Sequence, residues 1–257
     1  MLRHLILLIG FAFLASPSSS QDKKQPDKKS LPKVLYAVPL VVKTEVKQKL
    51  ALRGKGLADV KDIEVVGVKD ARIKVLGGKA VAVPNNYPAD RIGDSEVSIE
   101  LELPKDAKPG EVKLIAVGPG GKSAPYTLLL RDNLPAVDEK EPNDGFDQAQ
   151  TITVPSAIEG TIKGERDVDV FKFEGKKGDK LRIEIQAARY GSPLDAMLTL
   201  YDAGRRVIDS ASETTGNPDP ILNVTLPKDG IYYVGVIDAN DLGGSNFGYC
   251  LIIHSQK

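Results

Sequence analysis

The chain has 257 residues, which is enough for one large domain or two domains of ordinary size with real cores. Its hydrophobic content of 41% is that of a globular protein, and its 35 Lys and Arg residues balance its 35 Asp and Glu residues. This balance gives no electrostatic case for nucleic-acid binding, which needs a basic face, and the sequence has no basic amphipathic stretch that would lie on a membrane surface.

The first 20 residues have the three parts of a signal peptide. MLRH carries the positive charge, LILLIGFAFLA is the apolar run, and SPSSSQ supplies small residues for cleavage near Ser20. The apolar run is too short to span a bilayer. Residues 21–33, rich in Lys, Asp and Pro, predict a flexible linker. We therefore expect an exported protein, periplasmic, at the cell surface or secreted, without a membrane span.

From residue 34 onward, apolar and polar residues alternate with a period of two, and turn sequences rich in Gly separate the alternating segments. This pattern is typical of antiparallel strands with one solvated face, on which Arg53 and Glu184 would point outward. We predict an all-β fold of two tandem antiparallel β-sandwich domains, residues 34–131 and 132–257. The predicted inward positions in VKQKLALRG, EVSIELELP and KLRIEIQA are Val46, Leu50, Leu52, Val97, Ile99, Leu101, Leu103, Leu181, Ile183 and Ile185.

The break between the two predicted sandwiches lies at residues 131–144. This segment, RDNLPAVDEKEPND, is rich in Pro and charged residues and has few apolar ones. Such a composition is typical of the exposed segments that join domains. We therefore expect an exposed linker here.

The end of this linker crowds acidic side chains together, and two interpretations are open. In the first, Asn143 or Asp144 caps a short helical turn and the upstream acids are solvated. In the second, the acids bind Ca²⁺, which takes six to eight oxygen ligands. The second interpretation needs a further acidic cluster, GERDVDVF, to meet the first, and its oxygen donors would come from Glu139, Glu141, Asn143, Asp144, Glu165, Asp167 and Asp169.

The chain has few residues suited to nucleophilic catalysis or to a zinc site. Of its two histidines, His4 lies in the predicted signal peptide and His254 lies near the C-terminus. The single cysteine, Cys250, excludes an internal disulfide, and its apolar surroundings predict a small buried side chain. We predict that the protein is not an enzyme. A hydrolase with paired carboxylates is the enzymatic alternative, although an aromatic content of 5% counts against a sugar-cleaving cleft.

A series of motifs follows from residue 138 to residue 253: EPND and a turn containing AQ, the strand GTI, DVDVFKFEGKKGDKLRIEI, GSPLDAMLTLYDAGRRVI and LPKDGIYYVGV. In this order they resemble the bacterial pre-peptidase C-terminal domain, a β-sandwich appended to secreted peptidases and other exported proteins. That domain is similar to the collagen-binding domains of clostridial collagenases, which bind calcium. The downstream acids depart from the expected spacing, because Asp167 lies two residues before Asp169 and Arg166 lies three before it. The resemblance implies calcium ligands at Glu139, Glu141, Asn143, Asp144 and Asp169.

The first half, with AVPLVVKTEVKQKLALRGKGL, is similar to the immunoglobulin-like or TIG-like modules that precede such domains in exported bacterial proteins. Such a module implies a role in spacing or binding. The sequence as a whole predicts an exported, non-catalytic binding or anchoring protein that binds calcium. Its partner would be an extracellular or envelope protein or polysaccharide. The alternative is an accessory or targeting module for a separately encoded secreted peptidase or other hydrolase.

Overall fold

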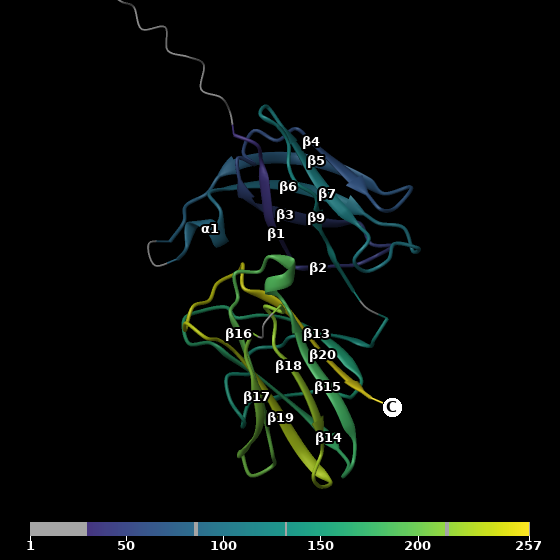
Figure 1. Cartoon of the computed structure of the whole chain (residues 1–257), viewed down its shortest axis with the longest axis vertical. Coiled ribbons are helices and arrows are strands. Elements are labelled where there is room, and N and C mark those ends of the chain that lie inside the picture. The colour runs from purple at the N-terminus through teal and green to yellow at the C-terminus, as the bar shows by residue number, and fades with distance from the viewer. Residues whose placement is uncertain (1–29, 85–86, 132, 214–215, 257) are drawn as a thin grey trace, which may run out of the picture.

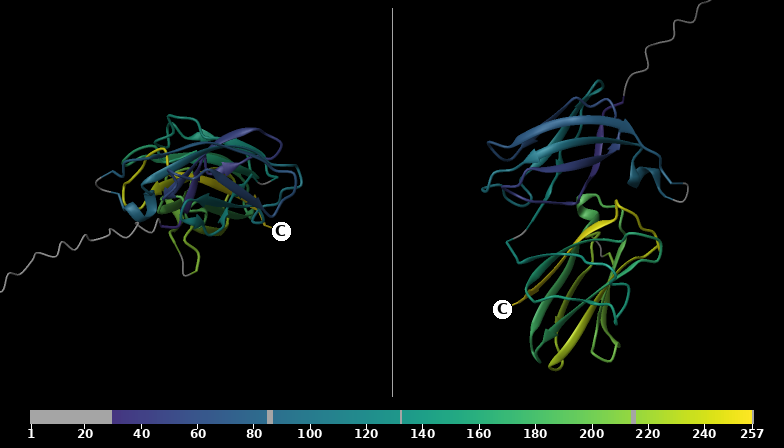
Figure 2. Two further views of the ribbon diagram at one scale, coloured as in Figure 1. Left: turned by 90° about the horizontal axis from the view of Figure 1, so that it is seen from above. Right: turned by 180° about the vertical axis from the view of Figure 1, so that it is seen from behind.

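The computed structural model describes residues 30–84, 87–131, 133–213 and 216–256. The predicted signal peptide, residues 1–20, lies outside these ranges, as does most of the predicted linker at residues 21–33. The described chain forms two β-rich units, one above the other in Figure 1 and again when seen from behind in Figure 2. Its helices are the short α1 (Ala89–Ile92) and the 3-10 helix η1 (Ala188–Tyr190). The predicted all-β fold of two domains is confirmed.

The first unit, called here the N-terminal sandwich, consists of two sheets and a short extra pair of strands. One sheet has the order β1-β3-β6-β5, the other has the order β4-β7-β8 with β9 also paired to β7, and β2 pairs with β10. Its core receives Leu50 and Ile99 from the first sheet and Ile63 and Leu114 from the second. The strands are β1 (Lys33–Val38), β2 (Val41–Val42), β3 (Gln48–Lys55), β4 (Asp62–Val66), β5 (Arg72–Ala80), β6 (Ser95–Glu102), β7 (Lys113–Gly118), β8 (Gly121–Lys122), β9 (Tyr126–Thr127) and β10 (Leu129–Leu130).

The second unit, called here the C-terminal sandwich, consists of two five-stranded sheets with the orders β11-β13-β20-β15-β18 and β12-β14-β19-β16-β17. Its core receives Ile183 and Leu251 from the first sheet and Phe171 and Val234 from the second. Within the described residues, no helix is both long and apolar enough to cross a membrane. The strands are β11 (Ala136–Asp138), β12 (Gln150–Thr151), β13 (Ser156–Thr161), β14 (Val168–Gly175), β15 (Lys180–Gln186), β16 (Ala196–Tyr201), β17 (Val207–Ala211), β18 (Ile221–Thr225), β19 (Gly230–Asp238) and β20 (Gly248–Ser255).

The alternation of the sequence predicts the buried face of most strands, with three exceptions. Val46 is exposed and lies outside β3. Arg53 and Glu184, expected on outer faces, are both buried. Arg53 lies 3.6 Å from the carboxylate of Glu96, and Glu184 accepts hydrogen bonds from Arg182. Both buried charged residues therefore have a partner of opposite charge. The period of two within one segment does not predict these partners.

The expectation of antiparallel pairing is wrong at three short strand pairs among the described residues. β10 runs parallel to β2, β11 runs parallel to β13, and β12 runs parallel to β14. Parallel neighbours need a long connection, because a tight hairpin reverses the chain. Each of these pairs has at least one other strand between its members in the sequence, so the connection is long enough.

The segment between the sandwiches is mostly exposed, as its composition predicts, but it is held in place. Ala136–Asp138 forms β11, an edge strand of the C-terminal sandwich. Asn143 is fully buried, and its carbonyl accepts a hydrogen bond from the backbone of Val170 at 2.9 Å. At the start of the segment, Arg131 pairs with Glu159 of β13. Most described residues of 131–144 are therefore exposed, as expected, but strand pairing, an ion pair and the buried Asn143 hold this segment against the C-terminal sandwich.

The two sandwiches also share a buried interface. The hydroxyl of Tyr126 accepts a hydrogen bond from Ala37 N at 3.1 Å and donates one to Tyr190 O at 2.9 Å. The hydroxyl of Tyr87 donates to Gly243 O at 2.6 Å. Because the bonds to Tyr190 and Gly243 cross between the units, the sandwiches form one packed body rather than two tethered ones. Apolar side chains on both sides complete the interface: Leu40, Val41, Leu129, Ala157, Cys250 and Ile252.

Gly191 allows a close approach of the two backbones at this interface. It follows η1 in a left-handed conformation, with φ at 86°. A Cβ atom there would lie 1.8 Å from the carbonyl oxygen of Leu35. Only glycine accommodates both the positive φ and this contact.

Candidate metal centre

The strand pairing of the C-terminal sandwich brings the two acidic segments together. After β11, Glu139 N donates a hydrogen bond to a carbonyl of β13 at 3.0 Å, so the chain continues along that strand. The bond from Val170 to the carbonyl of Asn143 then holds the following residues against β14. As a result, carboxylate oxygens of Glu139, Glu141 and Asp169 all lie within 4.8 Å of one another.

Asp169 is the most deeply buried acid of this group, with an exposed fraction of 0%. The hydroxyl of Tyr249 donates to its Oδ2 at 2.6 Å. Burial, together with the carboxylates of Glu139, Asp167 and Glu141, raises the pKa of Asp169 to about 8, although the hydrogen bond from Tyr249 lowers it. The carboxyl group of Asp169 is therefore protonated at neutral pH unless a cation lies beside it, because a neighbouring positive charge favours the ionised form.

Asp169 differs from the other buried carboxylates among the described residues. Asp219 and Asp238 each accept three hydrogen bonds from backbone N–H groups, and Asp202 accepts two. Glu184 accepts hydrogen bonds from a guanidinium and from an amide. Asp169 instead accepts bonds only from neutral side chains, the Tyr249 hydroxyl and, in one orientation, the Asn143 amide, and it faces two acids. Backbone donors therefore explain three of the other buried carboxylates but not Asp169.

Tyr249 reaches Asp169 because a glycine lies opposite it in the sheet. The register of β13 and β20 pairs Gly160 with Tyr249. A Cβ atom on Gly160 would lie 2.4 Å from the ring and hydroxyl of Tyr249. Any larger residue at this position would displace the ring from the acid.

The buried amide of Asn143 can face the acids in two ways. With its nitrogen toward them, it donates to Asp169 Oδ1 at 3.3 Å and to Glu141 Oε2 at 2.5 Å. With its oxygen toward them, it adds a fourth oxygen to the cluster, which a cation would coordinate. The two orientations exchange nitrogen and oxygen in nearly the same volume. Asn143 thus suits the site both with and without a bound cation.

Lys163, in the connection between β13 and β14, supplies a positive charge at the edge of the cluster. Its Nζ atom lies 2.8 Å from Glu139 Oε1 and 2.8 Å from Glu141 Oε1. Burial alone would lower the pKa of Lys163, but the hydrogen bonds to the two glutamates raise it above its ordinary value. Burial raises the pKa of Glu139. Burial would also raise the pKa of Glu141, but its hydrogen bonds with Lys163 and the Glu139 carboxyl lower it.

The other predicted ligands lie around this group. Asp144 is exposed. The partial loss of water around its carboxyl group, and then the negative charges of Glu141 and Asp167, raise its pKa. Asp167 accepts a hydrogen bond from the backbone of Lys163. Glu165 is exposed and does not belong to the group within 4.8 Å. The structure therefore brings Asp144 and Asp167 next to the cluster of three acids without placing them in it.

The helix-cap interpretation fails at the segment after Asp144. Residues 146–148 form a turn, closed by a hydrogen bond from Gln148 N to Gly145 O at 3.0 Å, and no helix is assigned there. Phe146 packs edge-to-face on Tyr201 and Tyr233, with ring centroids 5.1 Å apart in both pairs. Aromatic packing, rather than a helix dipole, positions this turn.

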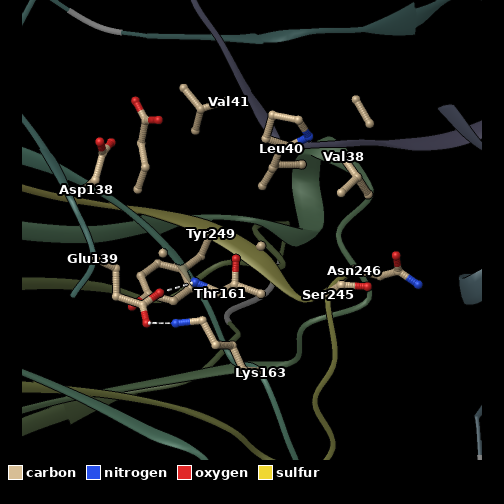
Figure 3. A pocket seen from close by; sticks show the side chains of 15 residues that line it. Val38, Leu40, Val41, Asp138, Glu139, Thr161, Lys163, Ser245, Asn246 and Tyr249 are labelled. Carbon is tan, nitrogen blue, oxygen red and sulfur yellow. Dashed lines mark hydrogen bonds and ion pairs between the residues drawn. The ribbon is translucent and has the colours of Figure 1, made fainter. Parts of the chain in front are cut away.

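A cleft of about 390 Å³ opens beside the acids, between the two sandwiches. Figure 3 shows Glu139 and Lys163 on one side of it and Val38, Leu40 and Val41 of the N-terminal sandwich on the other. Tyr249 is the one aromatic residue among its described lining residues. The described lining of this cleft therefore lacks the aromatic platforms on which sugar rings stack.

Cys250 and His254 do not form a catalytic pair. Both lie in β20, four positions apart, so their Cα atoms are about 13 Å apart along the strand. A nucleophile and its base must lie within hydrogen-bond reach. Cys250 is buried, as the sequence predicts.

The donor set of the cluster fits a hard cation such as Ca²⁺. Glu139, Glu141 and Asp169 offer carboxylate oxygens, and Asn143 offers an amide oxygen in one of its two orientations, the other being the one that donates to the acids. The sequence identified these four residues but missed Lys163 and Tyr249. The sequence around these two residues does not indicate their contacts with the acids. From the sequence alone, Lys163 is expected to be solvated and Tyr249 to be a core residue of the last strand.

Comparison with known proteins gives one family match. Residues 167–238 match the model of the bacterial pre-peptidase C-terminal domain. Over 117 residues the chain is 36% identical to a probable subtilase-type serine protease of Deinococcus radiodurans. This alignment covers 44% of the chain and 16% of the protease, so the chain spans only a small part of that relative's length.

Among the similar solved structures, two each align with just under half of the chain. The pre-peptidase C-terminal domain of a Bacillus anthracis collagenase is 20% identical, with a TM-score of 0.35 over 45% of this chain and 99% of that domain. A periplasmic inhibitor of g-type lysozyme from Aeromonas hydrophila is 15% identical, with a TM-score of 0.31 over 49% of this chain and 100% of the inhibitor. Because residues 167–238 match the family model, the resemblance of the C-terminal sandwich to the bacterial pre-peptidase C-terminal domain is confirmed.

Proposed function

We propose that the protein is an exported, non-catalytic binding protein whose C-terminal sandwich holds a calcium ion. Glu139, Glu141, Asn143 and Asp169 would coordinate the ion, and Asp144 and Asp167 would add negative charge around it. One observation carries the proposal: the fully buried Asp169 faces two other acids and accepts no backbone hydrogen bond within the described residues.

A calcium ion would change the protonation of this cluster. At neutral pH the crowded carboxylates keep a proton on Asp169, whose pKa is raised to about 8 chiefly by burial. A divalent charge among them favours the ionised forms and turns mutual repulsion into coordination. Calcium also accepts irregular sets of six to eight oxygens, whereas magnesium requires a small octahedron. The site should therefore prefer calcium.

The ion would act as a structural link. Glu139 and Glu141 belong to the segment that leaves the N-terminal sandwich, whereas Asp169 belongs to β14 inside the C-terminal sandwich. Coordination would tie this segment to the core and would stiffen the junction between the sandwiches. A rigid pair of sandwiches could present an extended surface to an extracellular or envelope protein or polysaccharide.

A second candidate function is an accessory or targeting module for a separately encoded secreted peptidase or other hydrolase. The 36% identity to part of a probable subtilase-type serine protease favours it. Capture experiments with the purified chain in culture medium would distinguish the two, since recovery of a hydrolase supports the accessory role. Export itself depends on residues 1–20, and it can be tested by locating the chain after cell fractionation.

The calcium proposal predicts a melting temperature that depends on calcium. At a hundredfold excess over the dissociation constant, calcium should stabilise the folded state by about 2.7 kcal/mol. For a chain of this size the melting temperature should rise by roughly 5 to 10 °C, and magnesium should have a smaller effect. Asp169→Asn should abolish the response, while Asp209→Asn, at an exposed residue of β17, should leave it intact. Equal melting curves in calcium and in chelator would refute the proposal.

A further inference from the structure

The ammonium group of Lys163 is aimed at the acids by backbone contacts around it. Ile162 N donates to Phe247 O at 3.2 Å, and Gly244 N donates to Ile162 O at 2.8 Å. The next residue, Lys163, has its own N–H bonded to the Asp167 carboxylate. The backbone is therefore fixed on both sides of Lys163, and its side chain contacts Glu139 and Glu141 from a defined position.

We propose that Lys163 is the resident counter-ion of this site and that its ammonium group and a divalent cation occupy the glutamate pair in alternation. The inference rests on the proposed calcium site. The Nζ atom takes one Oε1 oxygen from each glutamate, at 2.8 Å in both cases. Calcium uses these same oxygens when it binds carboxylates, often in bidentate fashion. An ammonium and a calcium ion sharing them would also repel each other at short range.

The cleft between the sandwiches gives the displaced ammonium a place to go. Lys163 lines this cleft, and its side chain is 52% exposed. Figure 3 shows the Lys163 side chain beside Glu139, with its nitrogen pointing toward the carboxylate. A rotation of the lysine chain about its own bonds would move Nζ into the cleft without any movement of the backbone.

Alternation gives Lys163 two effects on the protein. Without calcium, the ammonium neutralises part of the crowded charge and keeps the segment after β11 folded. With calcium, the ion must displace the ammonium, so the lysine lowers the apparent affinity. Lys163 would thus set the calcium concentration at which the site fills.

Calcium titration by isothermal calorimetry tests this role, with Lys163→Met as the variant and Lys140→Met as the matched control. Lys140 lies between the two glutamates in sequence and is exposed, but its side chain makes no ion pair with them in the described residues. Both substitutions remove one positive charge near Glu139 and Glu141, which Lys140 adjoins in sequence and Lys163 contacts in space. We expect about tenfold or tighter binding for Lys163→Met and less than a threefold change for Lys140→Met, which would reflect the loss of net charge alone.

The outcomes separate this inference from the proposed function. Equal calcium affinity in the wild type and Lys163→Met would overturn the alternation and leave the calcium site standing. Binding by Lys163→Met but not by the wild type would support the lysine as occupant and overturn calcium binding by the natural chain. Absence of binding in both would overturn both ideas.

A second measurement uses the wild-type protein, in case Lys163→Met does not fold. Acetic anhydride labels free lysine amines, and an ammonium held by two carboxylates reacts slowly. We expect labelling of Lys163 to rise several-fold when calcium replaces chelator, while labelling of Lys140 stays constant. Unchanged labelling of Lys163 in a sample that binds calcium would overturn the proposal.

Discussion

The two sandwiches hold their loops with different polar groups. In the N-terminal sandwich, the hydroxyl of Ser95 accepts from Leu57 N and donates to Gly54 O, so a neutral group satisfies both neighbours. In the C-terminal sandwich, carboxylates do this work, and among the described residues every buried one lies there: Asp169, Glu184, Asp202, Asp219 and Asp238. A carboxylate only accepts, so it must find donors or a cation. In the C-terminal sandwich, several carboxylates hold loops through backbone hydrogen bonds, whereas Asp169 has no backbone donor among the described residues.

The largest loss of stability should follow the removal of a carboxylate that accepts several backbone hydrogen bonds. Asp219 accepts hydrogen bonds from Ala187, Ala188 and Arg189, and Asp219→Ala would leave these donors without their acceptor. We expect a loss of about 3 kcal/mol or more in the free energy of unfolding, measured by urea denaturation. Ser95→Ala, which removes a neutral hydroxyl, should cost about 1 to 2 kcal/mol. Similar losses from the two substitutions would contradict the distinction.

The pH dependence of the stability of the metal-free protein tests whether Asp169 is protonated in the folded state. Its folded pKa, raised to about 8 mainly by burial, lies above its ordinary value of 3.8, so the folded state keeps a proton that the unfolded state loses. The free energy of unfolding should therefore fall as the pH rises from about 4 to about 8, by at most about 1.4 kcal/mol per unit.

Urea denaturation in chelator at several pH values measures this slope. Asp169→Asn should remove its contribution, and so should saturating calcium, which keeps Asp169 ionised in the folded state. The difference between wild type and variant cancels the other titrating groups. An identical slope in wild type and Asp169→Asn would show that Asp169 is ionised in the metal-free fold.

The interface offers a test of whether the two sandwiches act as separate bodies. Tyr126→Phe removes a hydroxyl that joins Ala37 and Tyr190 across the junction, and we expect a loss of about 1 to 2 kcal/mol. Differential scanning calorimetry should show one transition for the wild type, because the units share a buried apolar cluster. Tyr233→Phe is the control, since its hydroxyl has no hydrogen-bond partner within the described residues. Two well-separated transitions in the wild type would contradict the shared interface.

The smallest effect should come from Asp144. In the absence of calcium, Asp144→Ala should change the free energy of unfolding by less than about 0.5 kcal/mol, because this exposed acid caps no helix. Chemical denaturation in chelator measures the change. A loss near 1 kcal/mol would restore the helix-cap interpretation, which requires a side-chain bond to the following turn.

The sequence predicts the architecture better than the site, for a physical reason. Alternation in one segment fixes the inward face, so Val97, Ile99 and Leu101 are buried as expected. Buried charges such as Arg53 depend on partners from other strands, and these partners depend on register. A period of two within one segment carries no information about which residues pair across strands.

The site has the same limit. The sequence shows its acids as two local clusters, and the oxygen ligands that they offer predict that the clusters come together around a cation. The contacts of Lys163 and Tyr249 were not visible, since each depends on a pairing between distant residues, such as Gly160 opposite Tyr249. Local composition therefore identifies the clustered carboxylates but not Lys163 and Tyr249, which pair with them.

The pairing of β11 with β13 decides how the C-terminal sandwich can be produced alone. The family match begins at residue 167, but β11 covers the free edge of β13 from residue 136. A fragment that starts after β11 would present an unpaired edge whose residues Ser156, Ala157 and Ile158 are buried in the intact chain. Bare edges of this kind recruit strands from other molecules and aggregate. A soluble fragment should therefore begin before Ala136, inside what the composition alone would assign to a dispensable spacer.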